Sequence, residues 1–336
     1  MKIIIKISLL LFLIINSASA QQLPQYTQYI FNSFLINPAV AGIENYTDVK
    51  LGYRKQWSGI NGAPTTGFVS VNMPLGNNYL YGNANSFSGE GNNPMSRSFV
   101  QEYRAAEPHH GIGLSALTDQ AGPLRQSNIS AAYAYHIGIS SDFNLALGVS
   151  AGVTRFNLDY SALTTENFEP TLAEAITTQF KPYLGAGLWL YGPRFFAGIS
   201  GQQIYAQRIS YTTDDQYKDG KLVNHIFATA GYKIYMDDNF AAIPSIMLKY
   251  SAQSPLSYDI NAKIAYQDKF WVGAGYRHND AFSGMIGLNV SSLINLSYSY
   301  DATTSALQSV SNGSHEIILG ILLNNRYRVK CPQRQF

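Results

Sequence analysis

Hydrophobic and polar residues alternate along much of this chain with a period of two. The stretch from Asp48 to Trp57 puts apolar residues on one phase and polar residues on the other: Val49, Leu51, Tyr53 and Trp57 against Asp48, Lys50, Arg54 and Gln56. Successive side chains of a strand point to opposite faces, so the pattern predicts a strand with one apolar and one charged face. Phe143–Thr154 and Tyr258–Tyr266 repeat it, and no stretch has a convincing helical period.

Fourteen segments with this alternation are found after residue 46. They are 47–58, 64–75, 109–119, 126–138, 142–156, 181–191, 194–205, 222–235, 240–250, 256–267, 269–278, 281–292, 293–301 and 313–328. Short turn-forming stretches such as Asn279-Asp280 separate many of them. An even number of strands fits an antiparallel barrel whose first and last strands begin and end on the same side.

Three longer connections interrupt this spacing: Gly76–Pro108, Asn157–Lys181 and Ala206–Lys221. In bacterial outer-membrane barrels the longer loops lie on the extracellular side. If both termini are periplasmic, these loops follow the odd-numbered strands. The second and third connections follow strands five and seven, but the first follows strand two. Either Phe99–Arg104 hides part of a strand, or one long loop lies on the side of the termini.

The composition favours a membrane barrel over a soluble β-sandwich or propeller. Charged residues make up 13% of the chain and aromatic residues also 13%, with 24 tyrosines and 28 glycines. Soluble proteins contain about 25% charged residues. The polar phase here is largely Gly, Ser, Ala and Asn, and no propeller-like repeat is visible. We therefore predict an all-β protein, a transmembrane antiparallel β-barrel of about 14 strands spanning residues 46–330.

The first twenty residues predict a cleaved secretory signal. Lys2 and Lys6 precede the apolar run 7–15, and the small residues 18–20 precede Gln21. The apolar run is shorter than the roughly 20 residues that a membrane helix requires. Without the two lysines the chain has 21 basic and 21 acidic residues. This balance gives no reason to expect a nucleic-acid partner, and we expect the outer membrane of a Gram-negative bacterium.

Residues 21–45 differ from the rest because their aromatic residues lack a period of two. We predict a non-strand plug or tether at this end of the chain. Aromatic rings and amides suit either packing inside the barrel or contact with a partner chain, and the sequence leaves both open. The candidate plug or partner residues are Tyr26, Tyr29, Phe31, Phe34, Asn37, Pro38, Arg54 and Trp57.

Several charged residues fall on the polar phase of their strands and are expected to face the lumen. They are Asp48, Lys50, Arg54, Lys233, Lys249, Asp259, Lys263, Arg277 and Asp301. Their mixed signs favour mutual pairing over an ion pathway, because buried charge is least costly when it is paired. If paired charges fill the lumen in this way, we expect the protein to show little steady conductance.

Motifs of enzymes and cofactor sites are absent from the sequence. There is no P-loop, no dinucleotide-binding glycine pattern and no Gly-x-Ser-x-Gly elbow, and the six histidines lack zinc-site spacing. We therefore expect that the protein is not an enzyme and that it binds no cofactor and no metal. Cys331 is the single cysteine, so the chain has no internal disulfide.

Several short motifs, spread from end to end of the chain, resemble one known family. They are Pro24–Tyr29, Asn37-Pro38-Ala39 with Ala41-Gly42, Arg54–Trp57 with Gly62–Thr66, and Ser314–Ile317 with Leu319-Gly320 and Cys331-Pro332 near Phe336. They resemble the PorP/SprF outer-membrane proteins of the type IX secretion and gliding machinery of Bacteroidetes. The final residues 331–336 read as a short polar tail, because Pro332 cannot donate a hydrogen bond to a strand.

The resemblance implies a non-enzymatic barrel that supports secretion or surface attachment of an adhesin-like substrate through protein contacts. The partners it implies are that substrate or its C-terminal domain, other periplasmic or outer-membrane secretion components, and lipid. The sequence does not choose between substrate anchoring and a role in the machinery. The barrel pattern alone also fits a passive porin or small-solute channel, but such a channel does not need the aromatic segment 21–45.

Overall fold

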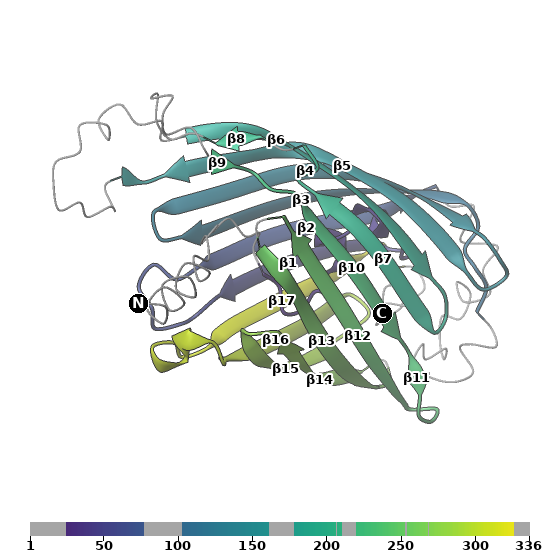
Figure 1. Ribbon diagram of the computed structural model, residues 1–336. Coiled ribbons are helices and arrows are strands. Elements are labelled where there is room, and N and C mark those ends of the chain that lie inside the picture. The colour runs from purple at the N-terminus through teal and green to yellow at the C-terminus, as the bar shows by residue number, and fades with distance from the viewer. Residues whose placement is uncertain are drawn as a thin grey trace, which may run out of the picture.

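The chain forms one closed antiparallel β-barrel (Figure 1). The structure is a computed structural model, and it describes residues 25–76, 103–160, 178–205, 207–209, 220–252, 254–267 and 269–325. The predicted signal 1–20 and the predicted tail 331–336 lie outside these residues. No helix in the described part of the chain is long and apolar enough to cross a membrane.

Fourteen strands make the barrel wall. They are β1 (Thr47–Lys55), β2 (Thr65–Leu75), β3 (His109–Ala121), β4 (Leu124–Gly138), β5 (Asn144–Leu158), β6 (Thr178–Tyr191), β7 (Phe195–Gln202), β10 (His225–Tyr232), β12 (Phe240–Ser251), β13 (Ser254–Tyr266), β14 (Phe270–Arg277), β15 (Ala281–Asn289), β16 (Ile294–Thr303) and β17 (Ser314–Leu323). Each strand pairs with the next, and β1 pairs with β17 from Thr47↔Leu323 to Lys55↔His315. This seam between the first and last strands closes the barrel.

Each predicted segment overlaps one barrel strand, so the predicted fold class is confirmed. Many predicted ends differ from the strand ends by one to three residues, and two segments differ more. The segment 222–235 divides at Lys233 into β10 and the short β11 (Ile234–Tyr235), and the last strand ends at Leu323. A two-stranded sheet, β8 (Arg208–Ile209) with β9 (Gly220–Lys221), was not predicted.

The long connection after β2 lies on the same side of the barrel as the start of β1. Most of the stretch Phe99–Arg104, where a hidden strand was considered, lies outside the described residues, and residues 103–108 contain no strand. The alternative of one long loop on the side of the termini is the one that the strand order supports.

The wall has an apolar outside and a polar inside. Outward residues such as Leu114, Ile129 and Val149 are well exposed, whereas Asn72 and Ser150 on the inward phase are buried. This is the arrangement that a lipid-facing barrel requires. Trp57 does not follow the outward phase predicted for it, because it lies beyond β1 in the turn, with a φ of 45°.

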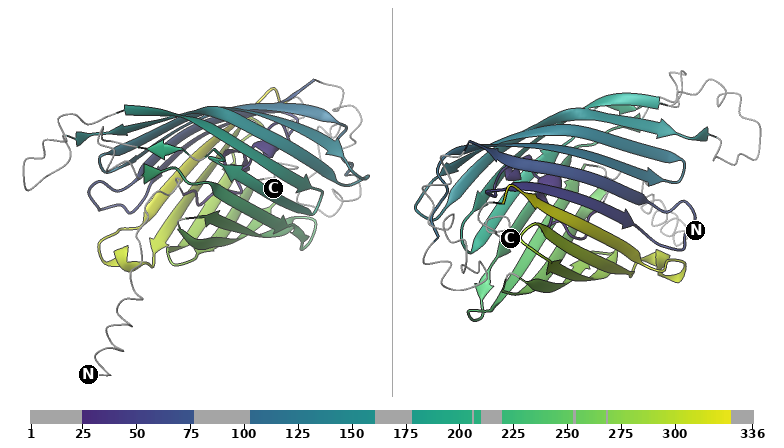
Figure 2. Two further views of the ribbon diagram at one scale, coloured as in Figure 1. Left: turned by 45° about the horizontal axis from the view of Figure 1, so that its top comes forward. Right: turned by 180° about the vertical axis from the view of Figure 1, so that it is seen from behind.

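Residues 25–46, here called the luminal segment, lie inside the barrel (Figure 2). The segment contains two short 3₁₀ helices, η1 (Ser33–Leu35) and η2 (Pro38–Val40). Elsewhere in the described residues, η8 (Ala306–Ser309) lies between β16 and β17. The first residues of the luminal segment contact the wall near the β1–β2 turn, and its last residues lie at the Thr47 end, where β1 begins. The segment therefore runs through the lumen in the direction opposite to β1.

Candidate functional site

A buried cluster of charged side chains holds the start of the luminal segment. Arg54 of β1 is 1% exposed, and its Nη1 donates to Glu316 Oε2 at 2.9 Å while its Nη2 donates to Asp301 Oδ2 at 2.7 Å. Thr27 bonds to the same two carboxylates: its backbone N–H donates to Glu316 Oε2, and its hydroxyl donates to Asp301 Oδ2. The first and last strands are thus bound to the same turn of the luminal segment.

Arg277 of β14 extends this cluster. Its guanidinium contacts Asp259, Asp280 and Asp301 at 3.2–3.5 Å and donates to the carbonyl oxygen of Tyr26 at 3.3 Å. Lys249 Nζ lies 2.9 Å from Asp259 Oδ2. Charges of both signs are paired throughout, which offsets the cost of burying them.

Two other lumen lysines lie over aromatic rings. Lys50 Nζ is 2.6 Å from Asp48 Oδ2 and 5.3 Å from the ring centre of Phe31. Lys263 Nζ is 5.4 Å from the ring centre of Trp271. Cation–π contacts of this kind are strongest where water is excluded. The Lys50 contact attaches Phe31 of the luminal segment to the wall, and the Lys263 contact joins β13 to β14.

Asn37 fixes the centre of the luminal segment to two strands. Its Nδ2 donates to the carbonyl oxygens of Leu188 and Ile199, on β6 and β7, at 2.9 and 3.3 Å. Its Oδ1 accepts from Ala39 N at 3.0 Å and so caps η2, with Pro38 at the first position of that helix. The Asn37 side chain thus caps the N-terminus of η2 and also bonds this helix to the wall.

Replacing Asn37 by alanine is expected to destabilise the folded barrel by about 2–3 kcal/mol, because it removes a helix cap and two hydrogen bonds to carbonyl oxygens. Urea unfolding in detergent micelles measures the loss. The matched control is Asn239→Ala, at an exposed turn, with an expected change under about 0.5 kcal/mol. Equal losses in the two variants would mean that the Asn37 contacts do not stabilise the barrel.

Two stacked histidines hold the last part of the luminal segment. The rings of His109 and His136 lie 4.5 Å apart and nearly parallel. His109 Nε2 contacts the Gly42 carbonyl oxygen at 3.2 Å, and His136 Nε2 contacts the Ala41 carbonyl oxygen at 2.8 Å. Gly42 has a φ of 73° and packs against Gly111 of β3, so a side chain at either position would separate the segment from the wall.

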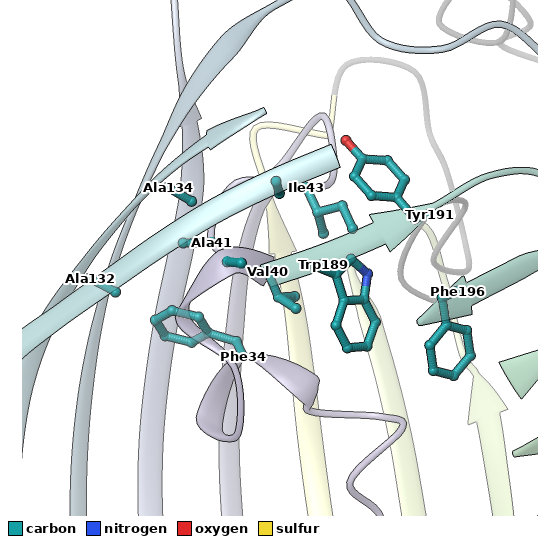
Figure 3. Packing of buried hydrophobic residues seen from close by; sticks show 11 residues of the cluster. Phe34, Val40, Ala41, Ile43, Ala132, Ala134, Trp189, Tyr191 and Phe196 are labelled. Carbon is teal, nitrogen blue, oxygen red and sulfur yellow. The ribbon is translucent and has the colours of Figure 1, made fainter. Parts of the chain in front are cut away.

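Apolar side chains pack around this second half of the segment (Figure 3). Phe34, Val40 and Ile43 of the luminal segment lie with Trp189 and Phe196 of β6 and β7 in one buried cluster. The rings of Trp189 and Phe196 are stacked, with 5.1 Å between their centroids. Together with the polar contacts, this cluster joins the luminal segment to strands around the whole circumference of the barrel.

The structure divides the predicted plug or partner residues into two groups. Tyr29, Phe31, Phe34, Asn37, Pro38 and Arg54 are buried against the wall. Tyr26 and Trp57 instead line a cavity of about 440 Å³ that reaches the connections at the β1–β2 end. The predicted lumen charges Asp48, Lys50, Lys249, Asp259, Lys263, Arg277 and Asp301 all lie on the inner face, and Lys233 lies buried between β10 and β11.

The sequence analysis did not nominate three residues of the buried cluster that holds the start of the luminal segment. Glu316 is 1% exposed and lies directly opposite Arg54 in the seam, and Thr27 and Gln28 supply N–H groups to its carboxylate. Glu316 lies next to the apolar Ile317 in a strand whose residues alternate, so its inward phase was visible in the sequence. Thr27 and Gln28 carry no such signal, because they lie outside any strand.

The comparison with protein families decides what this barrel is. The sequence profile of the type IX secretion system membrane proteins PorP/SprF matches residues 18–321. The chain belongs to this family. It is an outer-membrane β-barrel, as the family and the lipid-facing wall both indicate. None of the curated proteins matches the chain in sequence.

Solved structures of other outer-membrane proteins are similar to this PorP/SprF barrel. Omp33 of Acinetobacter baumannii has 9% sequence identity and a TM-score of 0.47, with coverage of 84% of this chain and 100% of that chain. The monoaromatic hydrocarbon channel CymD has 13% identity and a TM-score of 0.47, with coverage of 87% and 91%. A FadL homologue of Pseudomonas aeruginosa has 10% identity and a TM-score of 0.44, with coverage of 89% and 93%.

Proposed function

We propose that this PorP/SprF protein is a non-enzymatic component of the type IX secretion system that supports secretion or surface attachment of an adhesin-like substrate. On this proposal it works through protein contacts at the β1–β2 end and not by conducting solutes. The observation that carries it is the occupied lumen. The luminal segment is bonded to β16 and β17 at its start, to β6 and β7 at its centre, and to β3 and β4 near its end.

The orientation follows from the strand order. β1 begins and β17 ends at the Thr47 end, and outer-membrane barrels place these ends in the periplasm. The β1–β2 end is then extracellular. It also has the connections between β5 and β6 and between β7 and β10, which are long, as external loops usually are.

The residues at this external mouth suit contact with a protein chain. Tyr26 and Trp57 line the cavity there, together with amide side chains such as Gln203. Aromatic residues supply contact area at a low cost in conformational entropy, and they are enriched where proteins bind one another. Tyr29 is buried below them and contacts Ser245 of β12, so its expected role is packing.

This division gives the test. The double substitution Tyr26→Ala with Trp57→Ala is expected to lower the adhesin-like substrate retained at the cell surface by about ten-fold, since losing two anchoring aromatic residues typically costs 2 kcal/mol or more. Heat-modifiable gel mobility should remain that of a folded barrel. Surface labelling of the substrate in whole cells measures retention.

Two controls accompany the double variant. Tyr53→Ala removes an aromatic ring from the outer face of β1 and should leave retention unchanged. Tyr29→Ala should reduce barrel stability and substrate retention together, because its ring packs inside. If the Tyr26 and Trp57 variant folds and retains the substrate at the normal level, the proposed contact surface is wrong.

A further inference from the structure

Three polar residues meet in the wall of the cavity at the external mouth. His225 of β10 lies directly opposite Ser251 of β12, and Lys249 lies two residues before Ser251 on the same inner face. All three line the cavity. A cross-strand pair of this kind brings its Cβ atoms to roughly 5 Å, so the three polar groups form one patch.

This patch has unused hydrogen-bonding capacity. Ser251 is 7% exposed, and within the described part of the chain its hydroxyl has no hydrogen-bond partner. The His225 ring interacts with the backbone of Val223, and its nitrogens have no other partner among the described residues. Lys249 Nζ contacts Asp259, and an ammonium group has three donors. Buried polar groups without partners are costly and rare in folded proteins, so this arrangement points to a ligand that completes them.

The hydrogen-bond donors of the lining favour an anionic group. Arg277 and Asp280 also line the cavity, and their side chains are paired with each other at 3.2 Å. Lys249 lines the space beside His225 and Ser251, and its ammonium group, paired with Asp259, still has further N–H donors. Ammonium, hydroxyl and imidazole N–H groups together form a donor set suited to a carboxylate.

The rest of the lining is of two kinds. Leu35, Ile36, Phe227 and Met247 give one apolar wall, and the amide side chains of Gln126 and Gln203 give another, polar wall. A bare alkyl chain would leave these amides unpaired, which is costly. A peptide supplies apolar side chains to the first wall and backbone donors and acceptors to the second.

We propose that this cavity binds the free C-terminal carboxylate of an extended partner peptide that ends in an apolar residue. Lys249, His225 and Ser251 bind the carboxylate, and the apolar wall receives the last side chain. This inference rests on the proposed function, because it specifies how the partner protein is held at the external mouth. The cavity volume of about 440 Å³ falls within the range of ligand sites in proteins.

The test uses the purified full-length protein in detergent micelles and two probes. One is a fluorescein-labelled Gly-Ser-Ala-Val-Phe peptide with a free C-terminal carboxylate, and the other is the same peptide with a C-terminal amide. Fluorescence polarisation measures both affinities. We expect the carboxylate peptide to bind at least ten-fold more tightly than the amide, since hydrogen bonds to a charged group are the stronger kind.

Variants separate the patch from general effects on the barrel. Lys249→Met should weaken the carboxylate peptide about ten-fold and the amide little, and Lys249→Arg should restore part of the loss. Ser251→Ala removes a hydroxyl that bonds nothing in the described protein, so it should weaken binding about ten-fold without loss of heat-modifiable mobility. The matched control is Lys263→Met, because Lys263 lies over Trp271 and outside the cavity; it should bind like the unaltered protein.

Three results would overturn the inference: equal affinity for the two peptides, no binding of either, or displacement of the carboxylate peptide by octanoate at comparable affinity. The last would identify a site for simple alkyl carboxylates. The failure of the proposed function looks different. Cells that lack this protein would then retain the adhesin-like substrate normally, whatever the peptides do.

Discussion

Replacing Arg54 by methionine is expected to destabilise the barrel by about 3–5 kcal/mol. The substitution removes the guanidinium that lies between Glu316 and Asp301, while both carboxylates stay buried. A buried charge that loses its partner keeps its desolvation cost and has lost the attraction that offset it. Urea unfolding in detergent micelles, followed by heat-modifiable mobility, measures the change.

Arg155→Met is the matched control for this prediction. Arg155 lies on the exposed phase of β5, near the ring of Phe180, and its loss should change stability by less than about 1 kcal/mol. Adding Glu316→Leu to Arg54→Met should recover part of the loss, because the unpaired carboxylate is then removed. If Arg54→Met and Arg155→Met cost the same, the buried cluster does not hold the luminal segment.

The second prediction concerns the closed lumen. The double substitution Gly148→Val with Gly187→Val is expected to turn a silent protein into one with discrete conductance steps in planar bilayers. These glycines face each other on β5 and β6, and a Cβ at either would overlap η2: at Gly148 with Ala39, at Gly187 with Asn37. Overpacking typically costs 1–3 kcal/mol per site. We expect this strain to displace the luminal segment and not the wall, because each wall strand is paired with its neighbours.

The control for this experiment is Gly284→Val on β15. A Cβ there meets no atom within 4 Å, so the variant should stay as silent as the unaltered protein. Valine suits strands, so both variants should keep their heat-modifiable mobility. A folded double variant without conductance would show that the lumen is sealed by something other than the packing of η2 against Gly148 and Gly187. Steady, large conductance in the unaltered protein would contradict the closed lumen altogether.

The wall was predictable because its signal is local. Each strand shows its inner and outer phases within a few residues, as Phe143–Thr154 and Tyr258–Tyr266 do, and the wall follows from repeating that pattern. The errors lie where the alternation stops. Lys233 is buried between β10 and β11, and Trp57 turns back over the mouth of the barrel. At both places tertiary contacts override the local pattern.

The contacts of the luminal segment were not predictable in the same way. Thr27 meets Glu316 across 289 residues of sequence, and no local period indicates such a pairing. The unusual composition of residues 21–45 was visible, and so was the inward phase of Arg54 and Asp301. Which of these groups meet depends on the closed geometry of the barrel, so the sequence could supply the candidates but not the pairs.

The direction of the luminal segment also constrains how the molecule can be assembled. The first described residues of the chain are bonded to β16 and β17, among the last strands to be made, at the seam where β1 meets β17. A segment joined to β1 cannot be passed through a wall that has already closed, so it must lie within the curved sheet before the seam forms. Chains that lack β17 have neither Glu316 to receive the segment nor a partner for β1. Closure of the seam and burial of the luminal segment are therefore coupled, and a barrel that lacks β17 would leave the aromatic residues of this segment open to proteases.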